Sequence, residues 1–402
     1  MMLAKQEISI KHRSQEIEIG LLVAVVFLIP FVFFINIASF GTPDTLGIGT
    51  IAGMLLLGFF TPLVLHNRQN KTDLIYIILI VGIPLLISRK FPLVLIIDCY
   101  IFLLAKNYTK DIRLLRKILT SMMYSILIAA IWGIVHYEFF YTFITVDPEM
   151  IYDKIGQNMY VDLRNPAKLK ETSIYFGANV FGFFIALGQN LNTFLTRNKP
   201  KWFFFSVIFL VAVLTTGSRS GLLLFFIPAL LKLSMSKRLK KRQKGFLAVA
   251  LGFSVVTILP ILNSRFTIDA ILQDERIPKV IFAFSLFASN YKYFFIGIPA
   301  AAAMSSEGIS LSDNMYVNYV TALGFPLTIL IIAITVIMVS RFCRAFSVMD
   351  RTVSAILGSF VLFFISGLFS SNNSILLVNI YLSIMLGSIS RLTEEAQSNR
   401  SI

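Results

Sequence analysis

Residues 118–140 read ILTSMMYSILIAAIWGIVHYEFF, a run that carries no Lys, Arg or Asp and a single Glu. A helix needs about 20 mainly apolar residues to cross roughly 30 Å of hydrocarbon. Only helices and closed barrels satisfy their backbone polar groups inside lipid. Because this run is continuous rather than alternating, it predicts a transmembrane helix.

The composition of the whole chain resembles that of this run. Of 402 residues, 56% are hydrophobic and 14% are charged, and the mean hydropathy is +0.79. Soluble domains have about 45–50% apolar and about 25% charged residues. These values exclude a soluble enzyme, a disordered chain and a fibrous one. The 2 Cys exclude a disulfide scaffold, and the 3 scattered His argue against a histidine metal site.

Further apolar runs extend the pattern to about twelve transmembrane helices in a single all-α integral membrane domain covering 1–402. The third and fourth runs are short and fit either tilted spans or a re-entrant pair. The runs outside 118–140 are 19–38, 46–65, 73–88, 91–105, 174–196, 202–216, 220–234, 245–262, 314–340, 352–370 and 375–390.

The distribution of Lys and Arg predicts the orientation. If both termini are cytoplasmic, most of the 36 basic residues fall in cytoplasmic segments, as the positive-inside rule requires. Residues 1–18 are polar and precede a long apolar run, which predicts a retained first helix rather than a cleaved signal. The basic run KRLKKRQK at 237–244 predicts contact with anionic membrane lipids, not nucleic acid.

Two connections are long, at 141–173 and 263–313, and both are predicted to be external. Long ordered loops in compact proteins tend to be functional. Within the second, the pattern from Ile277 to Tyr293 predicts an interfacial helix that lies on the outer leaflet or caps the bundle.

The first candidate motif is LTTGSRSG at 214–221, between two predicted spans. Arg219 at an external helix boundary is unusual under the positive-inside rule. Gly217 and Gly221 permit a tight turn, and a helix start favours an anion. A guanidinium beside such a start suits a pyrophosphate. The alternative is a snorkelling interfacial arginine.

Charged residues gather at three further places on the external side. Arg276 and Lys279 begin the interfacial helix, either as an anion site or as a charged cap. Asp313 precedes the span at 314–340, either as an N-cap or as a base, with Asn314 beside it and Tyr316 one turn below. Arg164 lies in the first long loop, either as a further cation of the site or as part of a solvated segment.

These motifs, in this order, resemble the signatures of the O-antigen ligase/polymerase superfamily. TGSRSG at 216–221 is similar to the family turn T-G-S-R-[GS]-[AG]. Arg276, an amphipathic helix and FIGI at 295–298 resemble its Arg-led helix and closing glycine turn. DNMY at 313–316 with LGFP at 323–326 resembles its H/D-N-x-Y…x-G-x-x signature.

The resemblance implies a glycosyltransferase-C-like, metal-independent enzyme without a cofactor in the bacterial inner membrane. Its substrate would be an undecaprenyl-diphosphate-linked oligosaccharide in the outer leaflet, with arginines on the diphosphate. Family ligases present a His directly before the Asn. Because Asp313 holds that place here, the resemblance favours a polymerase, which is expected to work with a chain-length regulator.

The chemistry of such a transfer assigns roles to the candidate residues. A departing diphosphate gains charge, which Arg219 and Arg276 can stabilise with Arg164 or Lys279. The acceptor hydroxyl loses a proton to a base, for which we choose Asp313. Substrate contacts are assigned to Ser218, Asn314 and Tyr316, the phenol of which would orient the base. No paired Asp-x-Asp motif lies on an external loop, which agrees with a metal-free site.

The sequence thus predicts a polymerase that joins lipid-linked repeat units of O-antigen or capsular polysaccharide on the external face. One alternative is a ligase that transfers the glycan to lipid A–core. Another is a flippase for the same lipid-linked unit. The concentration of charge in two external loops favours an enzyme over a flippase.

Overall fold

The computed structural model describes residues 93–144, 178–236, 276–298, 315–347, 350–368 and 376–398, with the isolated positions 20, 23, 24, 26–28, 242 and 245. Within these ranges every regular element is an α-helix, and no strand is present. The prediction of an all-α chain is therefore confirmed for the described part.

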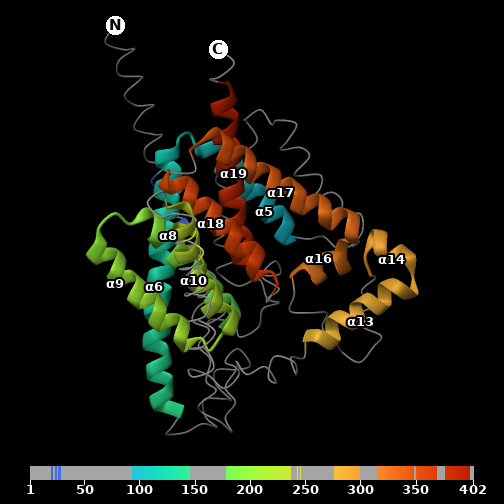
Figure 1. The fold of residues 1–402 in the computed structure, drawn as a ribbon, viewed down its shortest axis with the longest axis horizontal. Helices are drawn as coiled ribbons and strands as arrows, with labels where there is room; N and C mark the ends of the chain where they lie inside the picture. The colour runs from blue at the N-terminus through green and yellow to red at the C-terminus, as the bar shows by residue number, and fades with distance from the viewer. Residues whose placement is uncertain are drawn as a thin grey trace.

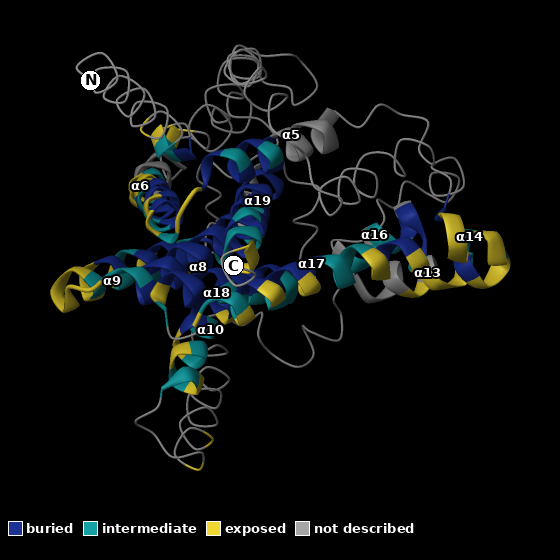
Figure 2. Cartoon of the chain, turned by 90° about the horizontal axis from the view of Figure 1, so that it is seen from above, coloured by how far each residue is buried: buried dark blue, intermediate teal, exposed yellow. Residues whose placement is uncertain are grey.

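Helix α8 (Ala178–Leu195) lies at the centre of a bundle (Figure 1). It contacts α6 (Ile112–Ile144), α9 (Lys199–Thr215), α10 (Arg219–Met235) and α18 (Arg351–Ser366). Its middle and carboxyl-terminal turns are almost continuously buried, as the dark blue α8 in Figure 2 shows. A helix that is apolar on every side is expected to be surrounded by other helices, and α8 is.

Glycines let the helices around α8 approach closely. A Cβ on Gly182 would lie 2.7 Å from the Cα of Gly221, so α8 and α10 touch backbone to backbone. A Cβ on Gly358 would lie 2.1 Å from Oδ1 of Asn190, so the amide on α8 occupies the space beside that glycine on α18. Small residues serve this purpose in helix pairs within apolar surroundings.

A buried amide reinforces the contact between α8 and α18. Nδ2 of Asn190 donates to the carbonyl oxygen of Ala355 at 2.8 Å and to Oγ of Ser359 at 3.1 Å. Asn190 has no exposed surface, so its hydrogen bonds form away from water. Such bonds between helices specify one relative orientation.

A second layer consists of α19 (Leu376–Ser398) between α5 (Leu93–Tyr108) and α17 (Phe325–Ala345). A Cβ on Gly387 would lie 2.2 Å from the carbonyl oxygen of Phe102, so α19 and α5 are also in close contact. This layer joins the bundle because α17 contacts α18.

A third group lies to one side of the bundle in both ribbon views (Figures 1 and 2). It contains α13 (Arg276–Ser289), α14 (Tyr291–Ile296) and α16 (Met315–Leu323). The ring of Phe294 stacks on that of Phe325 at the start of α17, with 4.6 Å between the centroids. This aromatic contact fixes α14 against the long helix.

The structure corrects two helix boundaries. The predicted single span 314–340 is two helices, because Gly324 (φ 79°) separates α16 from α17. A Cβ at Gly324 would lie 2.2 Å from the carbonyl oxygen of Phe295. Residues with a side chain rarely adopt this backbone conformation, and there is no space for a side chain here. The predicted interfacial helix is also divided, because the side chain of Asn290 caps a new helix by accepting from Lys292 N at 3.1 Å.

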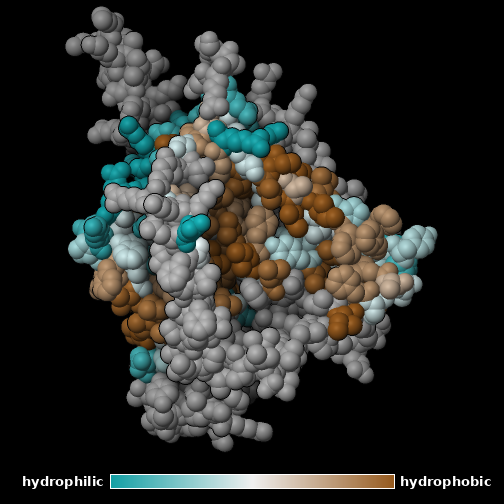
Figure 3. Space-filling model, viewed as in Figure 1, coloured by the Kyte–Doolittle hydropathy of each residue, from teal (hydrophilic) through white to brown (hydrophobic). Residues whose placement is uncertain are grey.

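Two helices of the described part are long and apolar enough to cross a membrane, Ile112–Glu138 within α6 and Phe325–Ala345. Shorter apolar helices occur at Ser220–Met235 and Arg351–Ser366. Figure 3 shows large hydrophobic areas on the face that includes α17 and the α13–α14 group. The predicted spans 19–38, 46–65, 73–88 and 245–262 lie wholly or mostly outside the described residues, so the number twelve stays a prediction.

Basic side chains connect the helices at one end of the bundle. Lys106 on α5 donates to Glu394 on α19 at 2.7 Å. Arg116 on α6 donates to Oγ1 of Thr352 at 3.0 Å and to Asp350, which caps α18, at 3.3 Å. The distribution of Lys and Arg in the sequence predicts that all of these segments lie on the cytoplasmic side of the membrane. The turn between α9 and α10 lies at the other end.

The ion pair of Lys106 and Glu394 is expected to stabilise the fold. The Lys106 side chain is 5% exposed and that of Glu394 is 26% exposed, whereas the neighbouring Arg391–Glu395 pair is 43% and 35% exposed. Removing one partner of a buried pair leaves an uncompensated charge, so Glu394→Gln should cost about 3 kcal/mol. Glu395→Gln, the matched control, should cost less than about 0.5 kcal/mol. Thermal unfolding of the detergent-purified protein measures both, and equal shifts would contradict the assignment.

Candidate functional site

The turn between α9 and α10 is defined by local backbone and side-chain bonds. Gly217 has a φ of 56°, a left-handed conformation that glycine adopts without strain. Its N–H donates to the carbonyl oxygen of Leu214 at 3.2 Å. Ser218 then caps α10, since its Oγ accepts from the N–H of Gly221 at 3.1 Å. The predicted tight turn and helix start are both present.

Hydroxyl and amide groups around Ser218 form a small buried cluster. The Ser218 hydroxyl donates to Oδ1 of Asn179 on α8 at 2.8 Å and lies 3.1 Å from Oγ of Ser220. The Ser218 N–H donates to Oγ1 of Thr216 at 3.0 Å. Thr216, Ser218 and Ser220 are all buried. Together with the contact between Gly182 and Gly221, these bonds hold the start of α10 against α8.

Ser218 is predicted to contact substrate, which stays a prediction, and its described bonds hold the turn. Its oxygen accepts from one backbone N–H while its proton points to Asn179 or Ser220. What the turn presents is the next residue, because Arg219 is the first residue of α10. The Arg219 side chain itself lies outside the described residues.

The second predicted arginine also begins a helix. Arg276 is the first residue of α13, and Lys279 follows within the first turn. The first N–H groups of a helix have no carbonyl partner within it and carry partial positive charge. Arg219 therefore stands where the backbone already favours an anion. The residues directly before Arg276 lie outside the described part of the chain, so the same environment at Arg276 stays a prediction. The side chains of Arg276 and Lys279 lie outside the described residues, as do Arg164, Asp313 and Asn314 entirely.

Tyr316 lies in the first turn of α16 and connects this helix to the bundle. Its hydroxyl donates to the backbone carbonyl of Phe364 on α18 at 2.6 Å. The sequence predicted that the phenol would orient the carboxylate of Asp313. In the structure the phenol proton is used in this bond to α18. The described role of Tyr316 is thus to position the start of α16, next to Asn314 and Asp313 in the chain.

Helix α18 links the two halves of the predicted site. It packs against α10, which begins with Arg219, and it accepts the hydrogen bond from Tyr316 on α16. Helix α13, which begins with Arg276, contacts α16. The helices that carry the three external motifs thus form one chain of contacts, α10–α18–α16–α13.

Sequence reasoning missed the partners that build this arrangement. Asn179 and Asn190 are polar residues within a predicted span, which is a usable signal for an interhelical contact. Gly182 gave no signal, because a single glycine in an apolar run does not reveal which helix it meets. The carbonyl of Phe364 could not be found at all, since every residue has one.

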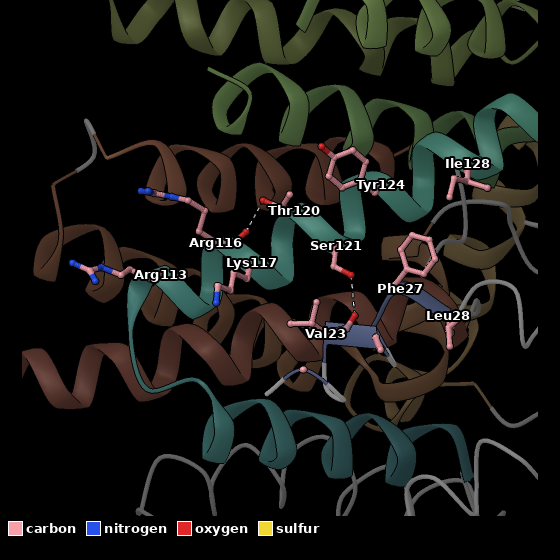
Figure 4. Close-up of a pocket in the computed structure, with 12 residues that line it drawn as sticks. Val23, Phe27, Leu28, Arg113, Arg116, Lys117, Thr120, Ser121, Tyr124 and Ile128 are labelled. Atoms are coloured by element: carbon pink, nitrogen blue, oxygen red, sulfur yellow. Dashed lines mark hydrogen bonds between the residues drawn. The ribbon is translucent and has the colours of Figure 1, made fainter. Parts of the chain in front are cut away.

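A cavity of about 960 Å³ lies elsewhere, between the described N-terminal positions and α6 (Figure 4). Arg113, Arg116 and Lys117 gather at one end, and Phe27 and Leu28 lie at the other. The hydroxyl of Ser121 donates to the carbonyl oxygen of Val23 at 2.9 Å, which attaches the N-terminal segment to α6. Neither Ser218 nor Tyr316, the predicted site residues with described side chains, lines this cavity.

Metal-binding potential can be assessed only for the described ranges. There, no group of three or more His, Cys, Asp and Glu side chains is close enough to hold an ion. Asp313 and both long loops are largely outside these ranges, so the metal-free mechanism stays a prediction.

Comparison with known proteins adds no assignment. No protein-family model matches the chain, and no curated protein matches it significantly.

The Ser218 cap should contribute to stability through the turn. Ser218→Ala removes the bond to Gly221 N–H and the bond to Asn179, which should cost about 1 kcal/mol. Ser218→Thr keeps the hydroxyl and should cost less. Ser234→Ala on the exposed end of α10 is the control, and it should leave the melting temperature nearly unchanged. If the Ser218→Ala protein has the same melting temperature as the wild type, the hydroxyl does not hold the turn.

Proposed function

We propose that this chain is a polytopic membrane glycosyltransferase that polymerises lipid-linked oligosaccharides on the external face of the bacterial inner membrane. The donor would be a growing glycan on undecaprenyl diphosphate, and the acceptor a lipid-linked repeat unit. In the reaction the acceptor hydroxyl oxygen bonds to the anomeric carbon of the donor. The bond between that carbon and the diphosphate breaks, and undecaprenyl diphosphate leaves.

The membrane location is supported by helix length and by exposed apolar surface. Two described helices are long and apolar enough to span, and α17 exposes Ile329, Leu330, Val336 and Ile337 by 44–62%. Side chains of this type on the outside of a bundle fit contact with acyl chains. The end that carries Lys106, Arg116 and their partners then faces the cytoplasm by the positive-inside rule. The capped turn before Arg219 faces outward.

The observation that carries the proposal is the capped turn Thr216–Gly221. It begins α10 with an arginine, at the end of the bundle opposite to the basic side chains. The leaving diphosphate gains negative charge in the transition state, and preorganised cations and helix N–H groups lower the energy of that charge. A turn held by Ser218, Asn179 and the Gly182–Gly221 contact supplies such preorganisation, since its backbone does not need to reorder during the reaction.

The second half of the proposed site comes from the helices beyond α18. Arg276 adds a cation at the start of α13, with Lys279 or Arg164 as a further contact. Asp313 takes the proton of the acceptor hydroxyl, and Asn314 contacts the substrate beside it. Tyr316 positions this segment through its bond to Phe364. Orientation of the Asp313 carboxylate by the Tyr316 phenol stays a prediction, because Asp313 lies outside the described residues.

Purified protein and a synthetic undecaprenyl-diphosphate repeat unit test the proposal. Wild type should produce glycans longer than one repeat unit. Arg219→Ala and Arg276→Ala should each lower the rate about 10²-fold or more, because each removes a charge contact that strengthens in the transition state. Asp313→Ala should lower it comparably. Arg341→Ala, an exposed arginine of α17 at the opposite end, is the control and should retain the wild-type rate.

The products made in cells separate this function from its alternatives. A strain without the gene should carry surface glycan of single repeat units. Loss of all repeats would indicate a ligase that acts on lipid A–core, and accumulation of repeat units on the cytoplasmic face would indicate a flippase. Long chains in a clean deletion would contradict the proposal.

A further inference from the structure

A cavity of about 550 Å³ opens at the end of the bundle opposite to the capped turn. It lies where the carboxyl-terminal end of α8, the amino-terminal end of α9, the last turn of α10 and the first residue of α18 meet. Its described lining contains four cations and no carboxylate: Arg197, Lys199, Lys232 and Arg351.

No carboxylate of the described residues neutralises this cluster. Among the described residues, none of the four cations forms an ion pair. Asp350 precedes Arg351 in the chain, but it caps α18 by accepting from Thr352 N at 2.7 Å and it also accepts from Arg116 at 3.3 Å. The nearest acid in the sequence therefore already has the Thr352 N–H and Arg116 as partners.

Lys232 is held at the cavity by two interactions. Its Nζ donates to the carbonyl oxygen of Thr193 at 3.3 Å and lies 5.3 Å from the centroid of the Trp202 ring. Both partners also line the cavity. These contacts place the ammonium group at the cavity, while the Lys232 residue remains exposed to solvent.

Such a concentration of positive charge fits a phosphate group. Like charges in one hollow repel, and a bound anion removes that repulsion. Arginine binds phosphate oxygens in a bidentate manner, and lysine adds a mobile point charge. Basic pockets between membrane helices on the cytoplasmic side bind phosphate-bearing lipid headgroups.

An exposed apolar stripe on α9 begins at this cavity. It consists of Phe203, Val207, Val211 and Leu214, which are 64%, 41%, 40% and 46% exposed. Their spacing of four, four and three residues places them on one face of the helix. Phe205 and Phe209 lie buried against the bundle. Figure 2 shows α9 projecting at the edge of the bundle with exposed residues along it.

The length of the stripe matches one leaflet. From Phe203 to Leu214 the helix rises about 16 Å, at about 1.5 Å per residue. Half of a hydrocarbon core of roughly 30 Å is about 15 Å. Phe203 belongs both to the cavity lining and to the stripe, so the polar and apolar parts are continuous.

We propose that this cavity binds the phosphate headgroup of an anionic phospholipid of the cytoplasmic leaflet, with an acyl chain along the Phe203–Leu214 face of α9. A free phosphate compound shares the headgroup chemistry, but it has no acyl chain to contact the apolar stripe. The site lies at the opposite end from the proposed transferase site, so the two proposals stand or fall separately.

Native mass spectrometry of the protein in mild detergent tests this site, with phosphatidylglycerol, cardiolipin or phosphatidylcholine added. The anionic lipids should bind saturably and more tightly than phosphatidylcholine. Arg197→Gln/Lys199→Gln should weaken anionic lipid binding about tenfold or more, because two headgroup contacts are lost. Arg341→Gln/Arg344→Gln removes the same charge from exposed positions of α17 and should change binding less than twofold.

A second pair of variants separates a lipid from free phosphate. Phe203→Ala should weaken lipid binding, whereas Phe204→Ala should not, since Phe204 is 61% exposed but does not line the cavity. Melting temperatures within 2 °C of wild type, as an acceptance limit of roughly 1 kcal/mol, confirm that each variant is folded. Equal losses in the cavity and control double variants would overturn the proposal. So would millimolar inorganic phosphate displacing the lipid while Phe203→Ala binds like wild type.

Discussion

The close contact of α8 with its neighbours is the constraint on which the rest of the structure depends. Gly182 lets α10 touch α8, and the amide of Asn190 occupies the space beside Gly358 on α18. Hydrophobicity alone cannot select one packing when all surfaces are apolar, so small residues and buried amides must do so. The position of α10 and α18 relative to α8 then determines where the capped turn lies and where Tyr316 finds its carbonyl partner.

The bundle has two chemically different ends. One end holds basic side chains in bonds between helices, and it also contains the cavity with four cations that form no ion pair with any described residue. The other end holds the buried hydroxyl cluster and the arginine that begins α10. This separation follows from the sequence, because the described helices of the bundle, α5, α6, α10, α17, α18 and α19, place most of their Lys and Arg residues at one end. Arg219 departs from the pattern, and the extra structure built around it is the physical argument that it has a role beyond anchoring.

The helices were predictable and their partners were not. The apolar runs at 118–140, 202–216 and 220–234 correspond to α6, α9 and α10, with boundaries shifted by a few residues. Uniformly apolar helices show little periodicity, so their sequences do not reveal which face is buried. Polar residues within apolar runs, such as Asn179 and Asn190, were the only sequence signal for contacts between helices. The break at Gly324 was visible as a Gly-Phe-Pro sequence, but continuous hydropathy on both sides favoured a single span.

The sequence predicted where a helix of the candidate site starts, but not which groups its side chains contact. Arg219 begins α10 as expected, because glycine and serine are recognisable start signals. The use of Ser218 as a cap and of Tyr316 as a link to α18 depended on tertiary partners that lie tens of residues away.

If Arg219 and Arg276 bind one diphosphate, as proposed, the two positions lie close together on the external side. Thiol cross-linking tests it directly, with Arg219→Cys and Arg276→Cys combined in a background of Cys99→Ser and Cys343→Ser. A short, membrane-impermeant bifunctional reagent added to intact spheroplasts should join the two positions, whereas the pair Arg219→Cys and Arg341→Cys should stay unlinked. Labelling of both single variants from outside without any cross-link, or labelling from the cytoplasmic side alone, would contradict the account.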